Sequence, residues 1–147
     1  MIQNKEAMET KFNFKSQICT DKNQSERLLA LGLKKETADM CITDNVECAF
    51  PCPEDDRFIS AWSLGRLIEM LPGLIYPKEE LPSFSGYAYL NLTQIVVWYN
   101  YIDYDMEDRT LISWRGNGIF SAVVDAIEWL IKEGYFNKEY LEEQNNG

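Results

Sequence analysis

Acidic and aromatic side chains crowd the stretch VWYNYIDYDMED at residues 97–108, whose residue types come nearest to a chemical site. Alternating carboxylates, beginning with Asp103 and Asp105, are the oxygen ligands that Ca²⁺ and Mg²⁺ prefer. An EF-hand loop needs glycine at its sixth position and glutamate at its twelfth, but a loop starting at Asp103 has Asp108 and Trp114 there. We therefore interpret the acidic end as a solvated turn that follows a strand, and we expect no metal site.

Few side chains in this sequence suit acid–base or nucleophilic catalysis. The chain contains no histidine, which excludes a Ser-His-Asp triad, a Cys-His pair and histidine-ligated zinc within one chain. Catalytic carboxylates must face one cleft with different pKa values, and nothing in the sequence indicates such a pair. The candidate carboxylates are Asp39, Asp103, Asp105 and Asp125. We predict a protein without catalytic residues; a small enzyme with carboxylate chemistry is the less favoured alternative.

Neither the cysteines nor a glycine-containing turn predicts a cofactor. The four cysteines form no C-x-x-C pair, and we interpret Cys48 and Cys52 as core residues or partly exposed thiols rather than ligands or a disulfide. The segment RGNG at 115–118 places Gly116 and Gly118 between a predicted strand and a predicted helix, as in a phosphate-binding turn. The third glycine of that fingerprint and the Lys-Ser/Thr of a P-loop are missing, so a helix-capping loop is the better interpretation.

The charge balance restricts the classes of partner. Twenty-four acidic and 14 basic residues give a formal charge of −10, and direct nucleic-acid binding is not expected because it relies on Lys and Arg. Acidic surfaces keep many soluble proteins apart, and a basic protein partner is also compatible. No apolar run approaches the roughly 18–20 residues of a membrane span, and the first 15 residues contain no signal-peptide stretch. We therefore expect a cytoplasmic location without membrane attachment.

Periodicity predicts the elements that position these side chains. Residues 60–73 and 117–134 have apolar side chains at helical i, i+3, i+4 and i+7 spacing, and they end at Gly73 and Gly134. The candidate N-caps are Ser60 or Ser63 for the first helix and Asn117 or Ser121 for the second. Three runs rich in β-branched and aromatic residues predict an antiparallel meander; they span 87–92, 95–102 and 110–115. We predict an α+β fold: a three- or four-stranded antiparallel sheet with the two main helices packed on one face.

The rest of the chain sets the domain boundaries. We assign residues 1–24 to a polar N-terminal extension, 25–141 to a single domain and 142–147 to a frayed tail. A short helix is expected to begin at a Ser25 cap and to stop at Gly32. The stretch CITDNVECAFPCPEDDRF that follows is expected to be irregular or to form a brief strand.

The strand at 95–102 has no clearly polar face, which leaves two arrangements open. It is buried on both sides, or it directs Val96 and Trp98 to the core and leaves Tyr99 and Tyr101 partly exposed. We favour the second arrangement, because a tyrosine can pack its ring against apolar groups while its hydroxyl remains in contact with solvent. The resulting candidate interaction surface comprises Tyr87, Tyr89, Tyr99, Tyr101, Asp103, Asp105 and Asp108. Alternatively, these aromatics complete the core or a dimer contact.

Several segments together resemble small uncharacterised proteins encoded by Bacteroides-type gut bacteria, their phages and mobile elements. The similarity covers roughly residues 25–141 and rests mainly on TADM at 37–40 and AWSLGRLIEMLP at 61–72. It implies a prokaryotic or phage accessory protein in the cytoplasm and brings no catalytic residue, cofactor or partner with it. We expect a non-catalytic protein that binds another protein. The alternatives are an immunity-type or nucleic-acid-mimicking inhibitor of a basic enzyme, and a structural homo-oligomer.

Overall fold

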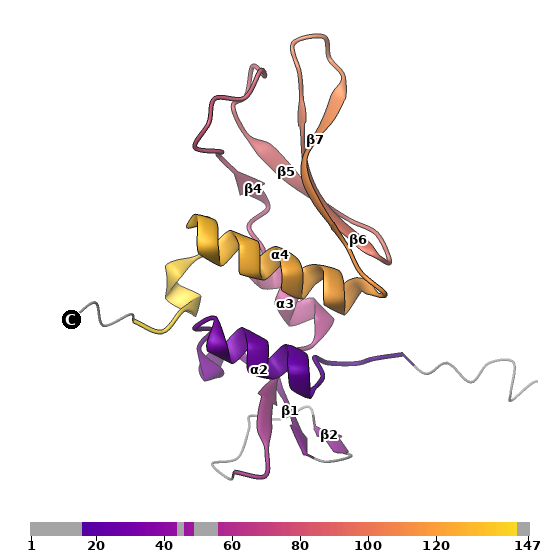
Figure 1. Ribbon diagram of the computed structural model, residues 1–147, viewed down its shortest axis with the longest axis vertical. Helices are drawn as coiled ribbons and strands as arrows, with labels where there is room; N and C mark the ends of the chain where they lie inside the picture. Colours follow the sequence, from indigo (N-terminus) through magenta and orange to yellow (C-terminus); the bar gives the residue numbers. More distant parts are fainter. Residues whose placement is uncertain (1–15, 44–45, 49–55, 144–147) are drawn as a thin grey trace, which may run out of the picture.

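In the part of the chain that the structure describes, three helices lie between two antiparallel sheets (Figure 1). The computed structural model describes residues 16–43, 46–48 and 56–143. The helices are α2 (Lys22–Ala30), α3 (Leu64–Met70) and α4 (Ile119–Glu133). Short 3-10 turns lie at Lys35–Thr37 and Lys138–Tyr140. The predicted α+β class is confirmed.

The larger sheet has four strands in the order β4-β5-β6-β7. They are β4 (Leu74–Ile75), β5 (Ala88–Leu92), β6 (Val96–Ile102) and β7 (Asp108–Arg115). All neighbouring strands are antiparallel, as the predicted meander requires, and β4 adds a short fourth strand. The pairing of β6 with β7 shifts register after Tyr99, so that Leu111 is an extra residue in β7 without a partner in β6. Such a β-bulge changes which face of the sheet the following side chains occupy.

The smaller sheet begins in the stretch that we expected to be irregular or to form a brief strand. It also includes residues 60 and 61, which we had wrongly assigned to the start of the helix at 60–73. Its strands are β1 (Met40–Thr43), β2 (Val46–Cys48) and β3 (Ile59–Ala61), in the order β2-β1-β3. Pairing of β1 with β3 places Met40 opposite Ala61, and both side chains are buried together with Cys19. The sheet therefore depends on contacts between segments that are separate in sequence, which local patterns do not indicate.

Helix α4 is the central element of the fold. It packs on β6 and β7, while α3 and α2 contact α4 from its other sides and α2 also contacts β3 (Figure 1). Its inward stripe includes Val123, Ile127 and Leu130, all fully buried. Of the two main helices expected on the sheet, α4 makes the more extensive contact with it, and α3 packs against α4 and contributes Leu67 and Met70 to the same core cluster as Val97 and Tyr99. The apolar side chains of α4 recur every 3.6 residues, and through them the helix connects the larger sheet to the other two helices.

The residues at the ends of α3 and α4 agree only in part with the predicted caps. Ser63 caps α3 by accepting a hydrogen bond from the Arg66 backbone N–H, as one of the two expected alternatives. The prediction for α4 was wrong, because Gly118 occupies the N-cap position and no side chain caps this helix. Gly134 ends α4 with φ +80°, a conformation that costs glycine little.

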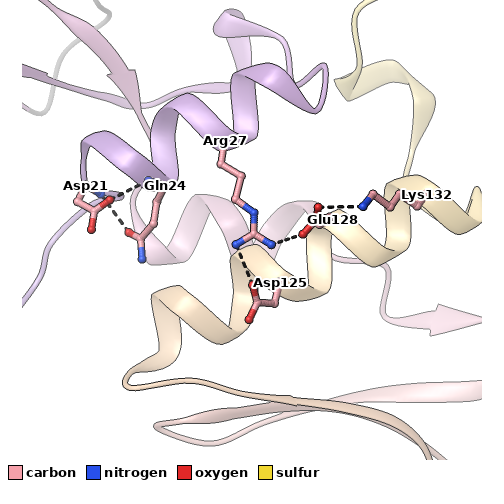
Figure 2. Close-up of polar contacts among 6 residues, drawn as sticks. All are labelled: Asp21, Gln24, Arg27, Asp125, Glu128 and Lys132. Carbon is pink, nitrogen blue, oxygen red and sulfur yellow. Dashed lines mark hydrogen bonds and ion pairs between the residues drawn. The ribbon is translucent and has the colours of Figure 1, made fainter.

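The predicted start of the first helix was also wrong. Asp21 is the N-cap of α2 and forms a capping box with Gln24, whose side chain returns to the Asp21 backbone (Figure 2). Ser25 is instead buried inside the helix, where its hydroxyl bonds the Thr20 hydroxyl at 2.7 Å. Within residues 16–24, which we assigned to an extension, Cys19 and Thr20 are buried and α2 begins at Lys22; residues 1–15 fall outside the described part of the chain.

The C-terminal segment returns to the end of α2. Leu141 forms a β-bridge with Leu33. The Glu142 backbone N–H donates to the Gly32 carbonyl oxygen at 2.7 Å, and the Lys34 N–H donates to the Tyr140 carbonyl oxygen at 2.8 Å. The first helix and the last described residues therefore share one set of backbone hydrogen bonds. The rest of the predicted frayed tail, residues 144–147, lies outside the described residues.

Arg27 ties α2 to α4 through charge (Figure 2). Its guanidinium donates to the Asp125 carboxylate at 2.8 Å and also to Glu128. Lys132 adds a second cation to Glu128 at 3.0 Å. Hydrogen bonds from Arg27 and then Lys132 lower the pKa of Glu128 below its ordinary value of 4.5. Because these side chains are partly exposed, the pairs contribute little individually, on the order of 0.2–1 kcal/mol each.

We expect the Glu128→Gln variant to be less stable than the wild type at pH 7 by about 1 kcal/mol. The folded-state pKa of Glu128 is depressed, so its contribution is complete above the unfolded-state value of 4.5 and is lost as pH falls through the folded-state value. Urea denaturation from pH 7 to pH 2 should show the two proteins converging at low pH. Glu133→Gln, on the exposed side of the same helix, is the control and should match the wild type; a constant difference at every pH would contradict the assignment.

Candidate functional site

The structure reverses the predicted faces of β6. Val97 and Tyr99 are fully buried against the helix layer, whereas Val96 and Trp98 are half-buried on the opposite face. The Tyr99 hydroxyl donates to the Pro72 carbonyl oxygen at 2.6 Å, and burial raises the pKa of Tyr99. Tyr99 is therefore a core residue, and the prediction that it belongs to an exposed surface was wrong.

The other predicted surface residues are divided between different places. Tyr101 is half-buried and packs against the core cluster. Tyr89 and Asp108 lie on the open face of the sheet, where the Tyr89 hydroxyl donates to the Asp108 carboxylate at 3.0 Å and Asn100 donates to both. Tyr87 contacts Tyr76 edge to face, with 6.0 Å between the ring centroids. These residues do not form one continuous surface with Tyr99.

Asp103 organises the turn between β6 and β7 and is itself buried. One carboxylate oxygen accepts hydrogen bonds from the backbone N–H groups of Asp105 and Glu107, at 2.9 and 3.0 Å. The other accepts from Arg109 Nε at 2.8 Å. The Arg109 hydrogen bond, followed by that from the Glu107 backbone, lowers the pKa of Asp103 below its usual range. Asp103 thus fixes the shape of the turn, whereas Asp105 is exposed.

This fixed turn presents large apolar side chains to solvent. Tyr104 is 54 % exposed, Met106 is 73 % exposed, and Phe84 from the β4–β5 loop is 78 % exposed. The Phe84 and Tyr104 rings meet edge to face with 4.7 Å between centroids. We call Phe84, Tyr104, Asp105, Met106 and Glu107 the tip; it lies at the end of the four-stranded sheet remote from α2 (Figure 1).

Met106 holds a conformation that is uncommon for its residue type. Its φ is +64°, and no other non-glycine residue in the described ranges has a positive φ. A side chain there costs free energy, of order 1–2 kcal/mol per residue, and the exposed Met106 side chain offsets none of it by burial. Outliers of this kind cluster at ligand-binding and switch regions. Met106 and Phe84 were not predicted from the sequence, although a phenylalanine between serines and near a glycine, as in SFSG, is an available signal for an exposed aromatic loop.

The candidate carboxylates outside the tip have separate structural partners. Asp39 accepts hydrogen bonds from the Ser63 backbone N–H at 2.8 Å and from the Ser63 hydroxyl. Asp125 is paired with Arg27. The structure does not bring Asp39, Asp103 and Asp125 to one cleft.

A depression of about 530 Å³ lies beside the N-terminus of α2, next to Cys19, Glu47 and Arg57. Burial, followed by the negative charges of Glu47 and Asp39, raises the pKa of Cys19 to about 11. A protonated thiol is a poor nucleophile, so this depression does not present Cys19 as a reactive group. Cys52 lies outside the described residues, as does the Cys48 side chain, and the interpretation of that pair stays a prediction.

Gly116 has a packing role at the start of α4. A Cβ at this position would lie 2.8 Å from Ser121 Cβ and 2.9 Å from the Ala122 backbone nitrogen. The close approach of β7 to α4 accounts for the first glycine of RGNG, and a phosphate-binding role is not needed to explain it.

Comparison with protein-family models, curated proteins and solved structures finds no match for this chain. The candidate site therefore stands on geometry alone. Among the described residues, none of the helices combines the length and apolar character needed to cross a bilayer. Within the same ranges, no three His, Cys, Asp or Glu side chains are grouped as metal ligands would be.

Proposed function

We propose that this protein is a non-catalytic accessory protein that binds another protein through the tip. The observation that carries the proposal is the group of three large apolar side chains, Phe84, Tyr104 and Met106, each more than half exposed and held around one fixed turn. The Phe84 and Tyr104 rings are in contact, and contiguous exposed apolar patches on monomeric proteins mark interaction sites when they are large. We expect the protein to act in the cytoplasm of a prokaryotic or phage-infected cell.

The turn is prepared for binding before a partner arrives. The Asp103 carboxylate holds the turn backbone through two hydrogen bonds, and a third from Arg109 fixes the carboxylate itself, so little conformational freedom remains to be lost on association. Methionine adapts its shape to a partner, and tyrosine is enriched at the residues that dominate interface energy. Asp105 and Glu107 flank these groups and favour a partner with basic residues at the rim.

The double variant Tyr104→Ser/Met106→Ser is expected to lose partner binding by at least about tenfold while keeping its stability within about 0.5 kcal/mol of the wild type. Immobilised wild type and variant should be compared by affinity capture from the native host, at low and high salt, with the captured proteins identified by mass spectrometry. Ile18→Ser is the matched control, because Ile18 is 52 % exposed at a site outside the tip.

A partner retained by the wild type and Ile18→Ser but lost by the double variant would support the tip. Equal capture by all three proteins would contradict it. Capture that survives the tip variant but disappears at high salt would instead favour the alternative of an acidic inhibitor of a basic enzyme, because that mode depends on long-range charge.

A further inference from the structure

Strand β7 leaves one side of the four-stranded sheet open. The order β4-β5-β6-β7 places it at the edge, and its eight residues form the longest strand of the described chain. Among the described residues, no loop or turn donates a backbone hydrogen bond to its outer side. An exposed edge of this length is a template for pairing with a further strand.

The β-bulge places opposite charges on the same face of this strand. Asp108 pairs with Ile102 and Arg115 pairs with Val96, and both of these β6 partners belong to the set that points away from α4 because paired residues share a face. In an unbroken strand, residues seven positions apart would point to opposite faces. Because Leu111 is the extra residue, Asp108 and Arg115 lie on one face, at the two ends of β7.

This arrangement makes β7 complementary to itself. When two copies of the strand run antiparallel about a two-fold axis at Ile112, with Leu111 left out of the register, Asp108 of each copy lies opposite Arg115 of the other. Thr110 then lies opposite Ser113, a pair of small hydroxyl residues that favours cross-strand contact. Neither Asp108 nor Arg115 has an ion-pair partner elsewhere in the described residues.

We propose that two copies of this chain associate through β7, joining their four-stranded sheets into one continuous sheet with two Asp108–Arg115 ion pairs across the junction. A second copy is the occupant that the charges favour, because strand ends of opposite sign attract in the antiparallel arrangement. The surface is separate from the tip, so both tips stay available at the two ends of the joined sheet.

The test measures self-association by sedimentation equilibrium up to millimolar protein. The wild type should show a monomer–dimer equilibrium. Arg115→Asp places two like-charged pairs at the junction and should weaken the dimer by about 100-fold, counting about tenfold for each pair. The matched control Arg66→Asp makes the same charge change on α3 and should leave the dimer unchanged.

Charge exchange gives the decisive result. Asp108→Arg and Arg115→Asp should each be monomeric alone, yet a mixture of the two should form a heterodimer because both cross-strand pairs are again opposite in sign. If Asp108→Arg fails to fold because it loses its bonds to Tyr89 and Asn100, amide hydrogen exchange of the wild type provides a second measurement. The outward amides of β7 should exchange more slowly as protein concentration rises.

A wild type that stays monomeric at millimolar concentration would overturn the proposal. So would a dimer that survives Arg115→Asp, or one that is lost in Tyr104→Ser/Met106→Ser but not in Arg115→Asp. If the tip variant loses partner capture but still forms the β7 dimer, both proposals are supported. That result would also show that partner binding and dimer formation use different surfaces.

Discussion

Replacing Tyr99 by alanine is expected to lower the free energy of unfolding by about 3–5 kcal/mol. The Tyr99 ring is fully buried, it meets Trp114 edge to face with 6.3 Å between centroids, and its hydroxyl bonds the Pro72 carbonyl oxygen. Truncation leaves a cavity between β6 and the helix layer and removes that hydrogen-bond donor. Guanidinium denaturation with linear extrapolation measures the loss directly.

Two control variants divide this effect into its causes. Tyr99→Phe keeps the ring and removes only the hydroxyl, so it should cost about 1–3 kcal/mol. Tyr104→Ala changes the exposed tip and should stay within about 0.5 kcal/mol of the wild type. If Tyr99→Ala were no more destabilising than Tyr104→Ala, the assignment of Tyr99 to the core would be incorrect.

Gly116→Ala is the second substitution for which we expect a large effect, a destabilisation of about 1–3 kcal/mol. The added methyl group would lie 2.9 Å from the Ala122 backbone nitrogen, which belongs to α4 and cannot move aside as a flexible side chain would. Either β7 or the first turn of α4 must shift. Thermal and chemical denaturation of the variant measure this cost.

Gly118→Ala is a matched control two residues away in the same RGNG segment. A Cβ at Gly118 meets no atom within 4 Å, and its φ of −171° is an extended conformation that any residue adopts. We expect a change within about 1 kcal/mol, because alanine is a poorer N-cap than glycine but restricts the unfolded chain. Similar losses in both variants would show that the close contact at Gly116 is not the cause.

Local periodicity was sufficient to predict the main elements of this fold. Residues 119–133 carry an apolar stripe at helical spacing, and the three strand-like runs form the predicted meander. The faces of β6 were not predictable in this way, because Trp98 and Tyr99 place large aromatic rings on both sides of the strand. Only the position of α4 decides which side is buried.

The candidate site depends on contacts between segments that are distant in the sequence, and these contacts cannot be predicted from local sequence patterns. Tyr104 and the acidic turn attracted attention from the sequence, but Phe84 reaches Tyr104 only because the β4–β5 loop folds toward the β6–β7 turn. Asp103 looked like a surface carboxylate and is instead the hydrogen-bond acceptor that shapes this turn. The side chain of a turn residue can be assigned to solvent or to the backbone only when the turn geometry is known.

The hydrogen bonds between Gly32 and Glu142, and between Lys34 and Tyr140, set an order of events during synthesis. Helix α2 emerges early from the ribosome, but the backbone groups that secure its end are translated among the last described residues. Until then, Leu33 lacks the β-bridge that it forms with Leu141 in the folded domain. The end of α2 can therefore make these native hydrogen bonds only after the C-terminal segment has been translated, so this part of the domain is not completed residue by residue along the nascent chain.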